Sequence, residues 1–394
     1  MSTGKHTVEA TDSCLSEELA YAVDTCARCG FCKVACPIYP FGGGFEVFSP
    51  RAKVYFLKEY YEGRVDLTPE WVDRLYRCTT CERCQSICQT AIPLVRLWER
   101  VRAEAVDREL GPMPAHKKLR DLAEQWGNPY GEPATTQSQW LLPDHAPLET
   151  ADILIFGGCT ASYRMPSMLQ TGVSMLTRLG VPYAYAGGEE HCCASPLLRT
   201  GQLSIAGELI SRNLRLFAYK GARRIVTPCG GCSKTLKHDY PVFAQKLGIP
   251  FDARVMHFSE VYVGLIREGR LKPVKPVNKV VTFHDPCHLG RSQGLFEEPR
   301  EILAAIPGLR LVEMAHCREE SRCCGAGGGV KSNYPQMAAA IARDRVAEAM
   351  ATGADILVTM CPFCQGSFDQ AIKELGGGID LCGLEALLLD SVAV

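Results

Sequence analysis

A cysteine pattern that occurs twice in the second half of the chain limits its architecture more than any other feature. Each copy contains a single cysteine, then an adjacent pair, then a closing C-x-x-C. The same order in both copies indicates an internal repeat, with one structural unit around each set of five thiols. The first copy is formed by Cys159, Cys192, Cys193, Cys229 and Cys232, and the second by Cys287, Cys323, Cys324, Cys361 and Cys364.

Apart from its cysteine content, the composition is that of an ordinary globular protein. The 394 residues are 46% hydrophobic, and the formal net charge of -1 favours neither nucleic acid nor a membrane surface as partner. The polar N-terminal sequence does not resemble a signal peptide, and no run of about 18 apolar residues is available to span a membrane. We therefore expect a cytoplasmic chain, free or docked to a membrane partner, whose 21 cysteines mainly bind metal.

Two further cysteine runs lie in the first hundred residues. The run that starts at Cys26 reads C-x2-C-x2-C-x3-C-P, and a second run of the same spacing starts at Cys78. This run is typical of bacterial ferredoxins with two cubane [4Fe–4S] clusters, in which the fourth cysteine of each run ligates the other cluster. The alternative, a pair of zinc knuckles, usually joins two C-x2-C units over a longer gap. The predicted ligand sets are Cys26, Cys29, Cys32 and Cys88 for one cubane, and Cys36, Cys78, Cys81 and Cys84 for the other.

Helical signals surround these runs. Ser49-Pro50 and Thr68-Pro69 each pair a capping residue with a proline suited to a first helical turn, and a further helix is expected over 96–108. We interpret residues 1–111 as a helical two-cluster ferredoxin domain, with a weakly ordered lead-in over 1–20 in which Cys14 is a plain thiol. Recurrent prolines indicate a linker over 112–150.

Short apolar runs then alternate with helical patterns, predicting doubly wound α/β lobes over 151–270 and 271–394. The whole chain is thus of the α+β multidomain class. In open parallel sheets ligands bind beyond the carboxyl ends of the strands, and every cysteine of the repeat falls there. The expected strands are 152–156, 181–185 and 224–227 in the first lobe, and 279–283, 309–314 and 355–360 in the second.

Five thiols in each lobe exceed the four that a cubane takes. An iron–sulfur cluster of another kind, with one cysteine of the adjacent pair bridging two irons, would use them all. Zinc remains an alternative, because four of the five could complete a tetrahedral site. Dithiol redox pairs at each C-x-x-C are a third interpretation, but they leave three cysteines of each lobe unexplained.

Three segments resemble a known family. These are the sequences HCCASP from His191, HDPCHLG from His284 and RCCGAGGG from Arg322. They are similar to the cysteine-rich "CCG" domains of heterodisulfide reductase catalytic subunits, and residues 1–111 resemble the ferredoxin subunit that is fused in the single-chain form. Iron–sulfur subunits of glycolate and lactate oxidases are related. The resemblance implies two non-cubane [4Fe–4S] clusters, one per CCG lobe, that face a cleft in which a disulfide is split with electrons from the cubanes.

Several residues beside the cysteines are candidates for supporting roles. His288, His191 and His284 could supply protons when a disulfide is reduced, since histidine titrates in the required range. Arg291 and Arg322 could hold an anionic substrate or a negatively charged cluster, the alternative being a solvated role. Cys317 and Cys382 lie outside the repeat and are interpreted as non-ligands.

The sequence therefore predicts an oxidoreductase subunit that works in a larger anaerobic complex. Flavin- or iron–sulfur-containing partners are expected, because the glycines at 325–329 do not form a dinucleotide fingerprint. One alternative is a pure electron relay for a hydroxy-acid dehydrogenase or another reductase. A second alternative, of a different class, is a zinc-stabilised binding module.

Overall fold

The computed structural model describes residues 13–392, and the side chain of Cys14 lies outside that description. The lead-in expected over 1–20 thus falls largely on residues that are not described. From Ser13 onward the chain is helical, which corrects the last part of that expectation. None of the described helices combines the length and apolar character needed to cross a bilayer.

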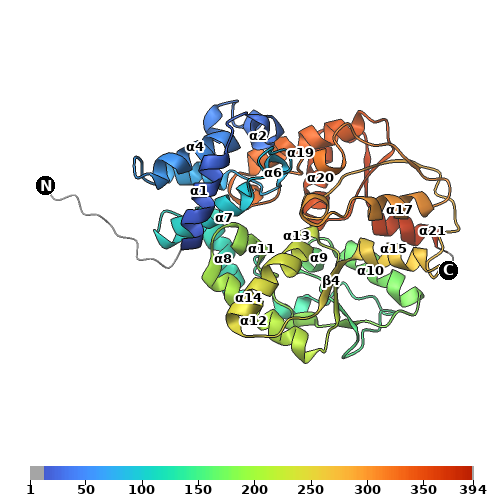
Figure 1. The fold of residues 1–394 in the computed structure, drawn as a ribbon. Helices are drawn as coiled ribbons and strands as arrows, with labels where there is room; N and C mark the ends of the chain where they lie inside the picture. Colours follow the sequence, from blue (N-terminus) through green and yellow to red (C-terminus); the bar gives the residue numbers. More distant parts are fainter. Residues whose placement is uncertain (1–12, 393–394) are drawn as a thin grey trace.

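The N-terminal part is built from helices, drawn in blue to cyan in Figure 1. The two predicted caps are confirmed, because Ser49 Oγ accepts from the amide of Ala52 at 3.0 Å and Thr68 Oγ1 from that of Trp71 at 3.4 Å. Its helices are α1 (Ser13–Thr25), α2 (Phe31–Ala35), α3 (Ile38–Phe41), η1 (Glu46–Phe48), α4 (Pro50–Tyr61), α5 (Pro69–Tyr76), α6 (Arg83–Ser86) and α7 (Leu94–Asp107).

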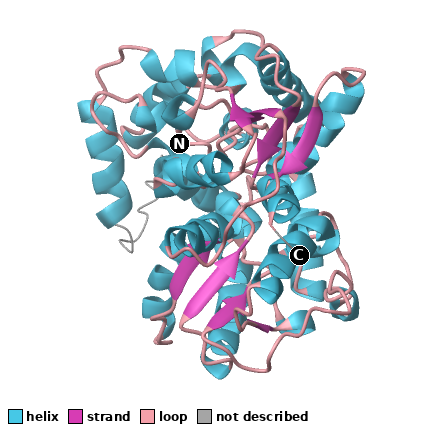
Figure 2. Cartoon of the chain, turned by 90° about the vertical axis from the view of Figure 1, so that its right-hand side faces the viewer, coloured by secondary structure: helices cyan, strands magenta, loops and turns pink. Residues whose placement is uncertain are grey.

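Two separate parallel sheets follow, visible as two groups of strands in Figure 2. The first has the order β2-β1-β3-β4 and the second the equivalent order β6-β5-β7-β8. The predicted mixture of helices with small parallel sheets is confirmed, but each sheet has four strands rather than three. The strands are β1 (Ile153–Ile155), β2 (Ala184–Tyr185), β3 (Arg224–Thr227), β4 (Arg254–His257), β5 (Val280–Phe283), β6 (Arg310–Leu311), β7 (Ile356–Thr359) and β8 (Asp380–Gly383).

Helices connect the strands in both halves. Those of the first half, with the short turns around them, are η2 (Ala134–Thr136), α9 (Cys159–Tyr163), α10 (Pro166–Arg178), η3 (Gly187–Glu189), α11 (Ser195–Arg199), α12 (Leu203–Tyr219), α13 (Gly230–Lys234), the π-helix η4 (Thr235–Asp239), α14 (Tyr240–Leu247) and α15 (Phe258–Arg267). Those of the second half are α16 (Gly290–Gln293), α17 (Glu297–Ala305), η5 (Arg318–Glu320), α18 (Val330–Asn333), α19 (Pro335–Met350), α20 (Pro362–Glu374) and α21 (Leu384–Ser391).

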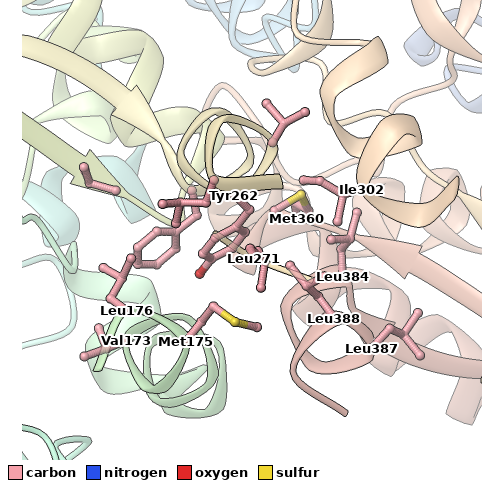
Figure 3. Packing of buried hydrophobic residues seen from close by; sticks show 14 of the residues in the cluster. Val173, Met175, Leu176, Tyr262, Leu271, Ile302, Met360, Leu384, Leu387 and Leu388 are labelled. Carbon is pink, nitrogen blue, oxygen red and sulfur yellow. The ribbon is translucent and has the colours of Figure 1, made fainter. Parts of the chain in front are cut away.

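The two sheet-bearing halves share one hydrophobic core. Helix α10 packs against α21, and α15 packs against α17. Figure 3 shows Val173 and Leu176 of the first half gathered with Leu384 and Leu388 of the second. Since α10 and α17 each follow the first strand of their sheet, and α15 and α21 each follow the fourth, the two contacts are equivalent. The halves are therefore related by an approximate two-fold axis.

The segment predicted as a linker contains a further helix, α8 (Pro114–Trp126). Pro114 stands in its first turn and Gly127 ends it with a left-handed φ of 71°, a common pair of helix boundaries. The sequence interpretation treated these residues only as loop signals. Helix α8 packs against α11 and α12 of the first half and against α18 of the second, so this segment is part of the packed structure.

Candidate metal centres

The first ferredoxin ligand set lines one small cavity. Cys26, Cys29, Cys32 and Cys88 are all at its wall, although Cys88 belongs to the second run. Burial, followed by the charges of the neighbouring thiols, raises the pKa of Cys32 to about 11. Cys29 is exposed, so this cavity, which we call the outer cavity, lies at the protein surface.

The second ligand set lines another small cavity, the inner cavity. Cys78, Cys81 and Cys84 of the second run meet Cys36 of the first run there, beside the buried ring of Trp98. Burial raises the pKa of Cys36 to about 12. Packing four thiols together makes thiolate formation costly unless cations compensate the charge, and iron ions would do so.

The two C-x-x-C-x-x-C loops turn in the same way. Gly30 has φ 88° and Glu82 has φ 63°, and each residue precedes the short helix that carries the third cysteine of its run. Glycine takes this conformation without strain, whereas Glu82 uses its side chain to fasten the loop. Its carboxylate accepts from Lys234 Nζ at 2.6 Å and from Ser292 Oγ at 2.7 Å, which ties the inner cavity to both sheet-bearing halves.

The cysteine repeat surrounds a third, larger cavity of about 520 Å³. Its wall is mostly apolar and includes cysteines from both copies, so we call it the shared cavity. Cys192 and Cys323 are not part of this wall; Cys159 Sγ donates to Cys192 Sγ at 3.8 Å, and Cys323 packs with Cys287 in one cluster. The cysteines of the wall are Cys159, Cys193, Cys229, Cys232, Cys287, Cys324, Cys361 and Cys364.

The strand order explains this convergence. Cys159 and Cys229 follow the adjacent strands β1 and β3, and Cys287 and Cys361 follow the adjacent strands β5 and β7. In a sheet of this order the first and third strands flank the topological switch point, where a crevice opens at the carboxyl ends. The two-fold packing turns both crevices toward each other, and the side chains of Cys229 and Cys361 lie close enough to interact across the axis.

The inner cavity and the shared cavity are in direct contact. Cys81 of the ferredoxin part and Cys323 of the second repeat pack in one buried cluster, close enough for their thiols to interact. Two glycines permit this approach: a Cβ atom on Gly327 would lie 2.3 Å from Thr79 O, and one on Gly328 only 2.1 Å from Cys78 O. The cysteines of the second repeat are therefore the ones that reach the ferredoxin ligand sets.

Comparisons with known proteins agree with this arrangement. Residues 22–92 match the family described as 4Fe-4S dicluster domain, and residues 153–237 and 281–369 match the family described as Cysteine-rich domain (CCG). One subunit of the dihydromethanophenazine:CoB–CoM heterodisulfide reductase from Methanosarcina barkeri is 38% identical over 374 residues, which cover 91% of each chain. The chain belongs to the family of this heterodisulfide reductase subunit.

Two less similar relatives of this chain are also named as redox proteins. One subunit of the CoM/CoB fumarate reductase from Methanothermobacter marburgensis is 34% identical over 90% of this chain and 69% of its own length. The EtfAB:quinone oxidoreductase from Syntrophomonas wolfei is 26% identical over 89% of this chain and 55% of its own length. The chain is accordingly an iron–sulfur protein with an oxidoreductase role.

The grouped thiols of the present chain suit iron–sulfur clusters better than single metal ions. Among residues 13–392, no three His, Cys, Asp or Glu side chains lie close enough together to hold one metal ion. A tetrahedral zinc site needs four donors around one ion, whereas a four-iron cluster offers a separate iron to each thiol. The matched families favour iron–sulfur clusters over the zinc interpretation.

Of the three candidate histidines, only His288 lines the shared cavity. Its Nε2 lies 3.2 Å from Thr80 O, and burial, helped by the charge of Lys234, lowers its pKa to about 4. His284 is buried beneath Arg345, whose Nε lies 3.2 Å from its Nδ1. His191 is held by the carbonyl of Glu189 at 3.0 Å. The structure thus brings one of these three rings to the site.

The two candidate arginines also differ in position, since one lies at the site and the other outside it. Arg291 contacts the backbone of the inner cavity, whereas Arg322 pairs with Asp344 at 2.8 Å outside it. Neither Cys317 nor Cys382 lines the shared cavity.

One buried residue near the site was missed by the sequence interpretation. Arg102 of α7 is fully buried, and among the described residues its hydrogen-bond acceptors are all backbone carbonyls. A signal was present, because Arg102 lies four residues after Trp98 on the apolar face of the helix, where an arginine needs internal partners. Its acceptors are Leu75 O at 2.6 Å, Arg199 O at 2.7 Å, Cys78 O at 3.0 Å and Gly328 O at 3.2 Å.

The wall of the shared cavity also holds two cations that were not predicted, Lys331 and Arg164. Arg164 is paired with Glu132 at 2.8 Å. Lys331 only reaches the polar atoms of Gly366 and Ser367, at 3.4 and 3.3 Å. The wall therefore combines thiols, apolar groups and a weakly held ammonium.

Proposed function

We propose that this chain carries electrons through two cubane [4Fe–4S] clusters to two non-cubane [4Fe–4S] clusters, at which a disulfide is reduced to two thiols. The ferredoxin sets would hold the cubanes, and each cysteine quintet would hold one non-cubane cluster. The observation that supports this most strongly is the shared cavity, which is lined by four cysteines of each quintet and lies next to the Cys81–Cys323 contact.

The proposed organisation keeps the boundaries expected from the sequence, with one change. Residues 1–111 form the ferredoxin domain, and 151–270 and 271–394 form two doubly wound CCG lobes. Residues 112–150 act as more than a linker, because α8 and the loop after it contribute Leu119, Pro129 and Tyr130 to the cavity wall.

The clusters, when bound, supply single electrons, and two of these with two protons convert one disulfide into two thiols. The chain's own residues provide the other requirements of the reaction, which are exclusion of water, a site for a proton and orientation of the substrate. The apolar wall excludes water from the sulfur atoms. The ring of His288 lies within the wall, where it can hold or pass a proton. The ammonium group of Lys331 can orient an anionic end of the substrate.

Electrons would arrive from a flavin- or iron–sulfur-containing partner at the outer cavity. Cys29 is exposed there, and the neighbouring side chains of Phe31 and Val34 are 50% and 82% exposed. Apolar groups of this kind beside a redox centre suit a protein partner.

A pure relay is the second candidate function. The similarity to a protein named as an EtfAB:quinone oxidoreductase supports it, because that name includes no disulfide substrate. In a relay the shared cavity would serve only to enclose the clusters.

Metal analysis and turnover of the full chain test both ideas. Four clusters require about 16 iron atoms per chain, whereas a protein with zinc in both lobes would hold about 8. Anaerobically purified protein should contain the higher amount and oxidise a reduced dye when small organic disulfides are added. Full iron content with no turnover of any disulfide would favour the relay, and zinc in both lobes would refute the proposal.

Two variants of α8 test whether the disulfide is reduced in the shared cavity. Leu119→Trp fills part of the shared cavity without replacing a cysteine, and Lys118→Trp places the same ring on the exposed side of α8. We expect the first to lower turnover at unchanged iron content and the second to leave it unchanged. Equal activities of both variants would show that the cavity does not bind the disulfide.

A further inference from the structure

Arg291 of α16 lies between the ligand sets of the inner cavity and the second repeat. Its Nε donates to Cys81 O at 2.7 Å, and its Nη1 donates to Ser321 O at 2.7 Å and Glu319 O at 2.9 Å. Three bonds to backbone carbonyls fix the plane of the guanidinium group.

The third nitrogen of this side chain has no such partner. Nη2 is buried, and no hydrogen-bond acceptor reaches it among the residues that the structure describes. Within the same part of the chain, no carboxylate forms an ion pair with Arg291; the nearby Glu82 is bound by Lys234 and Ser292. Arg291 is half-buried, but a charged nitrogen buried without an acceptor is unfavourable, so we expect the site to provide negative charge of another kind.

The groups that can provide it are sulfur atoms. Cys81, Cys287 and Cys323 are close enough to interact with the charge of Arg291. Cys81 belongs to the proposed inner cubane set, and the other two belong to the proposed quintet of the second lobe. The guanidinium group therefore faces both ligand sets at the point where they meet.

We propose that Arg291 sets the reduction potentials on the two sides of the Cys81–Cys323 junction, through its positive charge and an Nη2–H···S hydrogen bond to sulfur at the junction. This inference rests on the proposed function, since it needs clusters in both sets. A cation and a hydrogen-bond donor next to the sulfur ligands favour the more negative, reduced state. Arg291 thus makes the junction easier to reduce.

Arg322 provides a matched control. It lies close in sequence to Cys323 and also carries a charge, but Asp344 at 2.8 Å and Glu348 at 3.7 Å already neutralise it at the surface. A change of total charge alone would affect both arginine variants equally, whereas the proposed role is restricted to Arg291.

Redox titration followed by electron paramagnetic resonance tests the inference in the full chain. For Arg291→Gln we expect the reduced-to-oxidised ratio of at least one cluster to fall about tenfold at a fixed potential, which is a midpoint shift of about 59 mV for one electron. Arg291→Lys should shift less, and Arg322→Gln should leave the midpoints unchanged. Unchanged midpoints in Arg291→Gln at full iron content would overturn the inference while leaving the proposed function intact.

A measurement on the unsubstituted residue covers the case in which Arg291→Gln loses its clusters. In protein labelled with 15N-arginine, electron–nuclear double resonance should detect a 15N coupling to a cluster spin. The coupling should persist in Arg322→Lys and vanish in Arg291→Lys. Its absence from wild-type protein with full cluster content would overturn the inference, whereas absence of the clusters themselves would refute the proposed function.

Discussion

Cys36 belongs to the first ferredoxin run but lines the inner cavity, and Cys88 belongs to the second run but lines the outer cavity. The fourth cysteine of each run therefore lies in a different cavity from the other three. This crossing gives a prediction at the residue scale. Cys88→Ser should lose the same spectroscopic signal as Cys29→Ser, and Cys36→Ser the same signal as Cys78→Ser. Electron paramagnetic resonance of the four reduced variants provides the comparison.

The alternative is that each run keeps its own fourth cysteine. In that case Cys36→Ser would match Cys29→Ser, and the crossed assignment would be wrong. Iron analysis serves as the control, because each serine variant should lose about one cluster, or four iron atoms.

His116 predicts a pH dependence of stability. It is fully buried, its Nε2 lies 2.8 Å from Gly329 O, and burial lowers its pKa to about 4. The unfolded chain has a histidine pKa of about 6.5, so it binds the proton first as the pH falls below that value. The folded state should therefore lose about 2 kcal/mol between pH 6.5 and 5 from this residue alone.

Thermal unfolding at both pH values checks this expectation. His116→Gln removes the titrating group, so the variant should lose less stability on acidification than the wild-type protein, with the effect of acid on the clusters common to both. Parallel pH profiles of the two proteins would show that His116 does not contribute.

Among elements, the loop 325–329 makes the closest approach between distant parts of the chain. Gly328 has φ 60° and lies against Cys78 O, whereas Gly221 has φ 63° with nothing within 4 Å of a Cβ atom. Gly221→Ala should lose about 1 kcal/mol from backbone strain alone. Gly328→Ala adds an overlap with the backbone, so we expect it to lose about 1–3 kcal/mol more, as overpacked sites do.

Denaturant unfolding of both variants measures the difference. The spectrum of Gly328→Ala should also report a disturbed Cys81–Cys323 junction, while that of Gly221→Ala should not change. Equal losses of stability would mean that the loop moves aside freely.

The elements that were predicted correctly carry local signals. Ser49-Pro50 and Thr68-Pro69 indicate the starts of α4 and α5, because a cap and a first-turn proline act within a few residues. Strands β4 (RVMH) and β8 (DLCG) were missed because, unlike β3 (RIVT), they contain few of the β-branched residues that signal a strand.

The convergence of the cysteines was predictable only in part. Strand ends followed by cysteines place each quintet at one edge of its sheet, as the geometry of parallel sheets requires. The Cys229–Cys361 and Cys81–Cys323 contacts depend on how helices of different halves pack, and such contacts leave no mark on sequence spacing.

At the scale of the whole molecule, the ferredoxin ligand sets lie nearer to the cysteines of the second half than to those of the first. Cys323 packs with Cys81 in one buried cluster, whereas the amide of the equivalent Cys192 donates to Gly127 O at 2.7 Å. We expect Cys323→Ser to slow dye-driven reduction of both halves, by about 10-fold or more. Cys192→Ser should slow reduction of its own half alone.

Rapid freezing during reduction, with detection of each cluster signal, distinguishes the two variants. The iron content of each variant shows how much of the effect comes from lost cluster. If Cys192→Ser slowed both halves and Cys323→Ser only one, electrons would reach the first half before the second.

The two-fold relation between the halves has a consequence for how the two repeats can come together around the shared cavity. Each half offers the same pair of helices to the other, so the joint is self-complementary, as in a homodimer. A polypeptide with one repeat would have to pair with its own copy to enclose the same space, and its integrity would depend on concentration. Because the two repeats are joined in one chain, their pairing does not depend on concentration. The same fusion lets a single ferredoxin part lie on one side of the cavity that both repeats share.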